Sequence, residues 1–171
     1  MTSADHSFIC ASCGKSHDGL PTDFGYTLPD VVWAIPAGER SDRASFTKAL
    51  CRFGDRRFIR CLLPVPFTAR AGSYCFGVWA ELDAASFDRY YDLYDEDGTS
   101  EPEFSALLAN EVRGYEHVLG LPILVQLRDS TSRPNVRFPA DAGHAFAVDQ
   151  LRGINEDRYH QILLATGALV P

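Results

Sequence analysis

The sequence contains no long apolar stretch, because no run of hydrophobic residues approaches the ~20 that a membrane-spanning helix needs. Residues 1–6 are polar and lack the basic start and apolar run of a secretory signal. Basic residues are also in the minority: 16 Lys and Arg stand against 23 Asp and Glu, a net charge of -7. Broad contact with nucleic acid phosphates needs a basic face. We therefore expect a cytoplasmic protein that binds neither nucleic acid nor membrane, and whose charge permits a basic protein partner.

Common catalytic and phosphate-binding motifs are missing as well. The sequence has no Gly-x-Ser-x-Gly, no Gly-x-Gly-x-x-Gly and no Walker loop, which excludes a nucleophile elbow and the standard phosphate cradles. The acidic run around Gly98 is not an EF-hand. With Gly98 at the sixth loop position, Leu93 and Phe104 would occupy the first and twelfth positions, where oxygen donors are required. Residues 92–103 are interpreted as a solvated acidic loop.

Cysteine is scarce, but two of the five cysteines lie close together near the start of the chain. Cys10 and Cys13 are followed by Gly14 and then by His17. Thiolates and imidazoles are the usual zinc ligands, and glycine permits the left-handed backbone of a knuckle turn. With an odd number of cysteines and no export signal, free thiols or ligands are expected rather than disulfides. Residues 1–21 are therefore predicted to form a zinc-knuckle-like segment with a structural zinc.

A four-coordinate zinc requires one more ligand, from later in the chain or from water. The candidates are the remaining cysteines and histidines: His6, Cys51, Cys61, Cys75, His117, His144 and His160. Cys51 is the first choice, because it lies in a predicted strand near a sharp hairpin and a strand can run beside the knuckle. Two alternatives remain open: a redox Cys-x-x-Cys, which belongs between a strand and a long helix, and thiols without a ligand role.

Periodicity and turn residues predict the regular elements. A hairpin is expected over residues 47–65, with a type II′ turn at Gly54-Asp55 and an end at Pro64 and Pro66. Other expected strands are 7–9, 72–82, 123–128 and 135–138, and 29–36 is strand-like or irregular. Expected helices are 84–94, 104–112, 145–152 and one capped by Asn155. This order predicts a single α+β domain over 1–171, a mostly antiparallel sheet with helices packed on one face.

Several segments, from the knuckle to the predicted helix at 145–152, carry a family resemblance. They include Phe8-x-Cys10-x-x-Cys13-Gly14-x-x-His17-x-Gly19-Leu20-Pro21, Leu50-Cys51, Phe58-Ile59-Arg60, Phe76-Gly77-Val78-Trp79, Arg133-Pro134 and His144-x-x-Ala147-Val148-x-Gln150. In these segments the chain resembles an uncharacterised bacterial family catalogued as domain of unknown function 2199. The resemblance implies a Cys3His ligand set of Cys10, Cys13, His17 and Cys51. It also marks Trp79, His144 and Gln150, and it implies no activity.

Two classes of function remain open from the sequence. The first is a non-catalytic protein-interaction or regulatory role with a structural zinc site, which the acidic charge and the missing catalytic motifs favour. The second is an enzyme or small-ligand-binding protein with a pocket near His144 and Arg133, where Arg137 could also line the wall. A deep cleft containing His144 would favour the second class, and a flat acidic face would favour the first.

Overall fold

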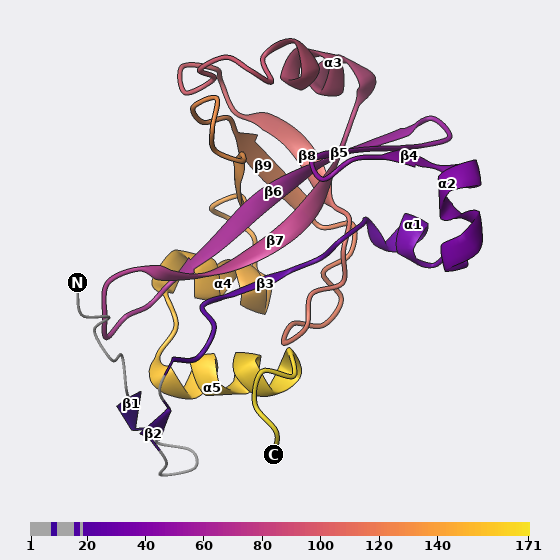
Figure 1. Cartoon of the computed structure of the whole chain (residues 1–171). Helices are drawn as coiled ribbons and strands as arrows, with labels where there is room; N and C mark the ends of the chain where they lie inside the picture. Colours follow the sequence, from indigo (N-terminus) through magenta and orange to yellow (C-terminus); the bar gives the residue numbers. More distant parts are fainter. Residues whose placement is uncertain (1–7, 10–15, 18) are drawn as a thin grey trace, which may run out of the picture.

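The computed structural model describes residues 8–9, 16–17 and 19–171 of the chain (Figure 1). The strands are β1 (Phe8–Ile9), β2 (Ser16–His17), β3 (Asp23–Gly25), β4 (Ser45–Phe46), β5 (Leu50–Phe53), β6 (Arg56–Pro66), β7 (Ser73–Leu82), β8 (Phe104–Leu108), β9 (Pro122–Gln126) and β10 (Asn135–Arg137). The helices are α1 (Asp30–Trp33), the 3-10 helix η1 (Ala37–Glu39), α2 (Arg40–Arg43), α3 (Ala84–Asp92), α4 (Ala145–Arg152) and α5 (Glu156–Ala165). The chain thus combines helices and strands, as predicted, and none of the helices in these ranges is long and apolar enough to cross a membrane.

A long hairpin of β6 and β7 forms the frame of the fold. Its strands pair antiparallel over ten residue pairs, from Arg57–Leu82 to Pro66–Ser73. β8, β9 and β10 follow β7 as antiparallel neighbours, and β10 then pairs in parallel with β6. These five strands close into a small barrel. β3 joins β7 on the same edge as β8, at a different point along the strand, and β5 and β4 extend from β6. The prediction of mostly antiparallel pairing is confirmed.

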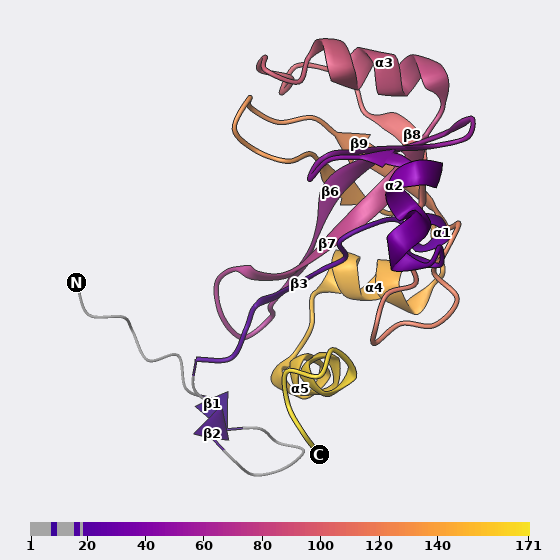
Figure 2. The same ribbon diagram turned by 45° about the vertical axis from the view of Figure 1, so that its right-hand side comes forward.

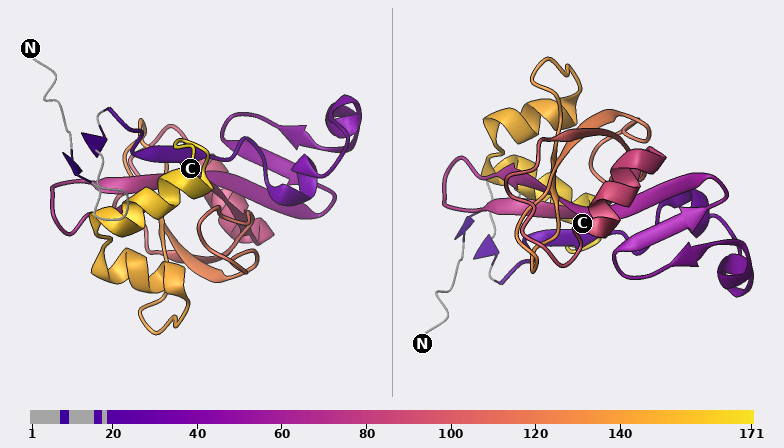
Figure 3. Two further views of the ribbon diagram at one scale, coloured as in Figure 1. Left: turned by 90° about the horizontal axis from the view of Figure 1, so that it is seen from below. Right: turned by 90° about the horizontal axis from the view of Figure 1, so that it is seen from above.

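The three longer helices lie at the two ends of the barrel. α3 is at one end, and α4 and α5 are at the other (Figures 1 and 3). The sheet of the predicted fold is thus a closed barrel. Closing β10 onto β6 turns one face of the sheet inward, and Phe87 of α3, Phe146 of α4 and Ile162 of α5 all join the cluster on that face.

Two apolar clusters bury the two faces of the β6–β7 hairpin. Tyr74, Phe76 and Val78 alternate along β7 and belong to the larger cluster, which fills the barrel and reaches α4 and α5. The smaller cluster lies on the opposite face of the hairpin. Its buried members are Leu28, Val32, Ile35, Ala44, Cys51, Phe58, Trp79 and Ala109. Both faces of β7 are thus largely covered, as its sequence predicts.

Residues 104–112, predicted as a helix, contain β8 instead. β8 pairs with β7 at Ala80–Leu108 and with β9 along its length. Ala106 and Leu108 are buried while Ser105 and Leu107 are exposed, the alternation of a strand. Leu107 and Leu108 favour a helix by local preference, but pairing with β7 and β9 makes the segment a strand, because tertiary contacts override local preference.

The segment 29–36, predicted as strand-like, contains the short helix α1. Asp30 follows Pro29, whose fixed φ suits the position before a helix. Val32 and Ile35 then fall on one side of the turn, and both are buried in the smaller cluster. Burial of these side chains, rather than the β-branched character of the segment, decides the local structure.

The predicted hairpin turn is confirmed, and the second strand ends at Pro66, close to the predicted bound at residue 65. Phe53 pairs with Arg56, and Gly54 has a φ of 58° as a type II′ turn requires. β6 continues through Pro64 to Pro66. The Leu62 N–H points away from β7, to the Pro134 carbonyl at 2.8 Å. By the period of two, the nitrogen of Pro64 lies on that same side, so the proline removes no bond to β7.

Asn110 joins β7 to the loop before α1. Its side chain is fully buried, and its Oδ1 accepts the Trp79 N–H at 2.8 Å. Its Nδ2 donates to the Leu28 carbonyl at 3.0 Å and to Asp30 Oδ1 at 2.9 Å. A buried amide with all these partners fixes the loop that covers the smaller cluster.

Replacing Asn110 with Ala should therefore destabilise the protein strongly. The change leaves the Trp79 N–H and the Leu28 carbonyl without a side-chain partner, and each buried unpaired group costs about 1–3 kcal/mol. We expect a loss of about 3 kcal/mol of unfolding free energy in urea titrations. As a control, Asn155→Ala removes only the cap bond to the Arg158 N–H and should cost about 1 kcal/mol. Equal costs for the two variants would contradict the role given to Asn110.

Candidate functional site

The barrel closes between β6 and β10 through a single residue pair, Leu62 and Asn135. In the described residues, no further backbone pairing joins the two strands beyond this point, where β6 runs on to Pro64 and Pro66. We call this junction the β6–β10 seam. A parallel pair normally continues as an evenly spaced ladder, so the carbonyls beyond the seam need partners from elsewhere.

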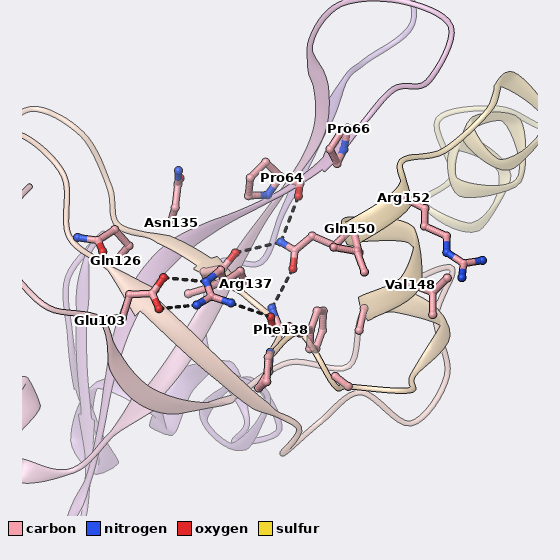
Figure 4. Close-up of a pocket in the computed structure, with 16 residues that line it drawn as sticks. Pro64, Pro66, Glu103, Gln126, Asn135, Arg137, Phe138, Val148, Gln150 and Arg152 are labelled. Carbon is pink, nitrogen blue, oxygen red and sulfur yellow. Dashed lines mark hydrogen bonds and ion pairs between the residues drawn. The ribbon is translucent and has the colours of Figure 1, made fainter.

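Gln150 of α4 supplies those partners. Its Nε2 donates to the Pro64 carbonyl at 3.2 Å and to the Val136 carbonyl at 3.1 Å, and its Oε1 accepts the Phe138 N–H at 2.9 Å (Figure 4). One amide thus bridges β6, β10 and the residue after β10. Because both amide hydrogens and the oxygen are used, the side chain holds the two strands apart at a fixed separation.

A cleft of about 630 Å³ opens beside this bridge, between the two strands and α4. Its lining is mostly apolar and comes mainly from β6, from β10 with the loop that follows, and from α4, with Glu103 before β8 and Gln126 at the end of β9. The lining residues are Pro64, Pro66, Glu103, Gln126, Asn135, Val136, Arg137, Phe138, Pro139, Ala140, Ala142, Ala147, Val148, Gln150, Leu151 and Arg152. The volume falls in the range of roughly 300–1,000 Å³ that is typical of small-molecule sites.

An ion pair lies along the cleft opposite α4. Arg137 Nε and Nη2 donate to the two carboxylate oxygens of Glu103 at 2.7 and 2.6 Å (Figure 4). This fork lowers the pKa of Glu103 and raises that of Arg137. Both side chains remain partly exposed, so the pair gives the wall a fixed polar edge without an unbalanced charge.

The predicted zinc ligands lie mostly outside the described residues. Cys10 and Cys13 fall there, and for His17 the structure gives its backbone pairing in β2, opposite Phe8. Within residues 8–9, 16–17 and 19–171, no group of three or more His, Cys, Asp or Glu side chains is placed to hold a metal.

Cys51 is fully buried in the smaller apolar cluster. Burial raises the pKa of its thiol to about 11, which disfavours the thiolate that a metal requires. β5, which carries Cys51, lies towards the opposite end of the molecule from β1 and β2 (Figures 1 and 2). In this arrangement Cys51 is a core residue, and its assignment as a ligand rests on the sequence alone.

His144 and Arg133, predicted to share a pocket, line different hollows. His144 caps α4: its Nδ1 accepts the Phe146 N–H at 3.0 Å, and its Nε2 donates to the Glu116 carbonyl at 2.8 Å. Both ring nitrogens are therefore used in fixing the helix. Arg137, by contrast, lines the cleft.

The sequence matches the model of a family described as "Uncharacterized protein conserved in bacteria (DUF2199)" over residues 9–154. The chain belongs to this family. No curated protein and no solved structure matches the chain. The DUF2199 match contains all residues that line the cleft, and it ends before α5.

Two polar residues of the DUF2199 region were not assigned a role from the sequence. For Gln150 the sequence offers only the family resemblance, because no neighbouring residue indicates that its amide bridges two strands.

Arg60 could have been singled out from the sequence, because it is a charged residue among the apolar positions of the longest strand. Such a residue must face either solvent or a partner.

Replacing Gln150 with Leu should destabilise the protein and alter the cleft. The variant leaves the Phe138 N–H and the Pro64 and Val136 carbonyls without their amide partner. We expect a loss of about 3 kcal/mol in chemical denaturation. The exposed Gln161 of α5 serves as the control, since Gln161→Leu should change stability by less than about 0.5 kcal/mol. A Gln150→Leu variant as stable as the parent would show that the bridge is dispensable.

Proposed function

We propose that the protein binds a small, largely apolar ligand in the cleft between α4 and the β6–β10 seam. The observation that carries this proposal is the cleft itself: about 630 Å³, mostly apolar walls and a few fixed polar groups. Concave apolar sites with a small number of oriented polar groups are typical of ligand binding. Gln150 keeps the strands separated, so the site does not need to be opened by the ligand.

The lining suggests which chemistry the ligand has. Pro64, Val148 and Leu151 offer apolar surface to a hydrocarbon or aromatic body. The Glu103–Arg137 pair is already charge-balanced, and the other charged residue of the lining, Arg152, is exposed to solvent. The pair therefore suits a neutral hydrogen-bonding group better than a second ion. We therefore infer a neutral ligand with an apolar body and a polar end.

The same lining favours binding over catalysis. The residues of the cleft include no cysteine, serine, threonine, histidine or lysine, the usual nucleophiles and bases. Its one carboxylate, Glu103, has its pKa lowered by Arg137 and is a weak base at neutral pH. A non-catalytic role is consistent with these side chains.

A neutral apolar fluorophore, N-phenyl-1-naphthylamine, tests the proposal. We expect saturable fluorescence enhancement on titration of the full chain. Val148→Trp places an indole in the cleft and should weaken binding at least tenfold. Leu119→Trp adds the same group at an exposed site outside the cleft and should bind like the parent. Absence of saturable binding, or equal binding by a folded Val148→Trp variant, would overturn the proposal.

The zinc site remains a second proposal, supported by the spacing of Cys10, Cys13 and His17. Such a site would be structural and would order the N-terminal segment. With Cys51 buried in an apolar cluster, the fourth position in this arrangement falls to water or another ligand. Zinc analysis of the parent protein and of its cysteine variants tests both the zinc site and the predicted role of Cys51 as a ligand.

Elemental analysis of protein purified without a histidine tag should find about one zinc per chain. Cys10→Ser should reduce the zinc content to background. We expect Cys51→Ala to keep its zinc and to lose about 1 kcal/mol of stability from the truncated core contact. Zinc loss in Cys51→Ala would instead establish Cys51 as the fourth ligand. A fully folded parent protein without metal would end the zinc proposal.

A basic protein partner remains a proposal, supported by the charge of -7, and a cytoplasmic location remains a proposal as well. Part of the acidic charge is balanced within the chain. Glu101 pairs with Arg89 and Glu103 with Arg137. A basic partner would therefore find its contacts among the remaining acidic residues of the loop 92–103.

A further inference from the structure

Arg60 lies on the outer wall of the barrel, in the middle of β6. Its neighbours Ile59 and Cys61 point to the other face and are fully buried. Arg60 itself is half-buried, and its Nε is enclosed without a hydrogen-bond partner. Within the described residues, its guanidinium forms no hydrogen bond and no ion pair. A buried cationic donor without a partner is costly, so this position calls for an explanation.

Two glycines make room for this side chain. Gly25 of β3 pairs with Gly77 of β7, and Gly77 pairs with Leu62 of β6, so the glycines form the floor of a trough across three strands. A Cβ atom on Gly25 would lie 2.9 Å from Arg60 Nη2, and one on Gly77 would lie 3.7 Å from it. Neither glycine has a positive φ. Space, rather than backbone conformation, is therefore what these glycines provide.

A second arginine faces the same trough. Arg133, from the loop before β10, lines a hollow of about 420 Å³ together with Arg60, Gly25 and Gly77. Burial lowers the pKa of Arg60, and the charge of Arg133 lowers it further. Within the described residues, the Arg133 guanidinium also forms no ion pair. We call this site the arginine hollow.

The other groups in the arginine hollow do not balance the two charges. Asp23 lines it from β3, but its carboxylate is exposed and makes no ion pair within 4 Å with either arginine. Cys75 is the remaining polar side chain, and burial raises the pKa of its thiol, which keeps it neutral. The hollow thus contains two guanidinium groups, and the one carboxylate in its lining, that of Asp23, forms an ion pair with neither of them.

We propose that the arginine hollow binds the phosphate group of a small organic phosphate, between Arg60 and Arg133 over the Gly25–Gly77 floor. Guanidinium forks match the geometry of phosphate oxygens. A phosphate monoester carries close to two negative charges at neutral pH, so it offsets both arginines, whereas a monocarboxylate offsets one. The hollow exceeds the size of a phosphate group, which leaves space for the organic part. This site is separate from the apolar cleft and does not depend on its ligand.

Isothermal titration of the full chain with inorganic phosphate tests the proposal, with acetate at matched ionic strength as the comparison. We expect saturable phosphate binding that is at least tenfold tighter than acetate binding. Arg60→Gln and Arg133→Gln should each weaken phosphate binding at least tenfold. Lys48→Gln removes the same charge from an exposed site outside the hollow and should leave the affinity within twofold of the parent.

Gly25→Ala separates geometry from charge. Its new Cβ meets only the flexible end of Arg60, so the variant should fold, keep every charge and displace the guanidinium. We expect phosphate binding to weaken severalfold, with an unchanged far-UV circular dichroism spectrum. The proposal is overturned if phosphate does not bind saturably, or if acetate binds equally well. It is also overturned if folded Arg60→Gln and Gly25→Ala variants bind phosphate like the parent.

Discussion

The backbone of β6 must find hydrogen-bond partners on both sides, and only one side has a single continuous neighbour. Toward β7 it pairs over ten residues. On its other side the partners change along the strand: β5 first, then the Pro134 carbonyl at Leu62, then Gln150 at Pro64 and the Ile154 N–H at Pro66. Buried backbone groups are almost always paired, so the course of β5, β10, α4 and the start of α5 is tied to this one strand.

The prolines of β6 fit the same need for hydrogen-bond partners on the side of the strand that faces away from β7. Pro64 and Pro66 have no N–H, and on the side away from β7 their carbonyls are used by Gln150 and Ile154. A donor at either position would face the region where β10 has already turned away. The two prolines therefore match a stretch of strand that needs acceptors only. The cleft forms in the space that this arrangement leaves open.

Local sequence signals predict the elements whose structure is decided locally. Asn155 caps α5 through the Arg158 N–H, and Gly153 ends α4 with a φ of 83°. The alternation of β7 is equally self-contained. β8 is different, because residues 104–108 become a strand through pairing with β7 and β9, which the segment itself does not encode. Barrel closure is likewise a non-local event that rests on one residue pair.

The candidate sites show the same division. The spacing of Cys10, Cys13 and His17 is local and can be read from the sequence, whereas the surroundings of Cys51 cannot. A strand position near a hairpin does not reveal which face of the sheet is covered, and here Val32 of α1 and Ile35 just after it cover the face that carries Cys51. Arg60 stands out in its strand, but its glycine floor comes from β3 and β7. Only the folded chain brings these three segments together.

The β6–β10 seam also separates the two hollows. Leu62 lines the arginine hollow, and its partner Asn135 lines the apolar cleft. Arg133 and Asn135 are close in sequence, on either side of Pro134, whose carbonyl accepts the Leu62 N–H. A charged group and an apolar surface are thus presented on opposite sides of one short backbone connection. Because that connection also closes the barrel, the positions of both sites depend on the same few hydrogen bonds that hold the fold together.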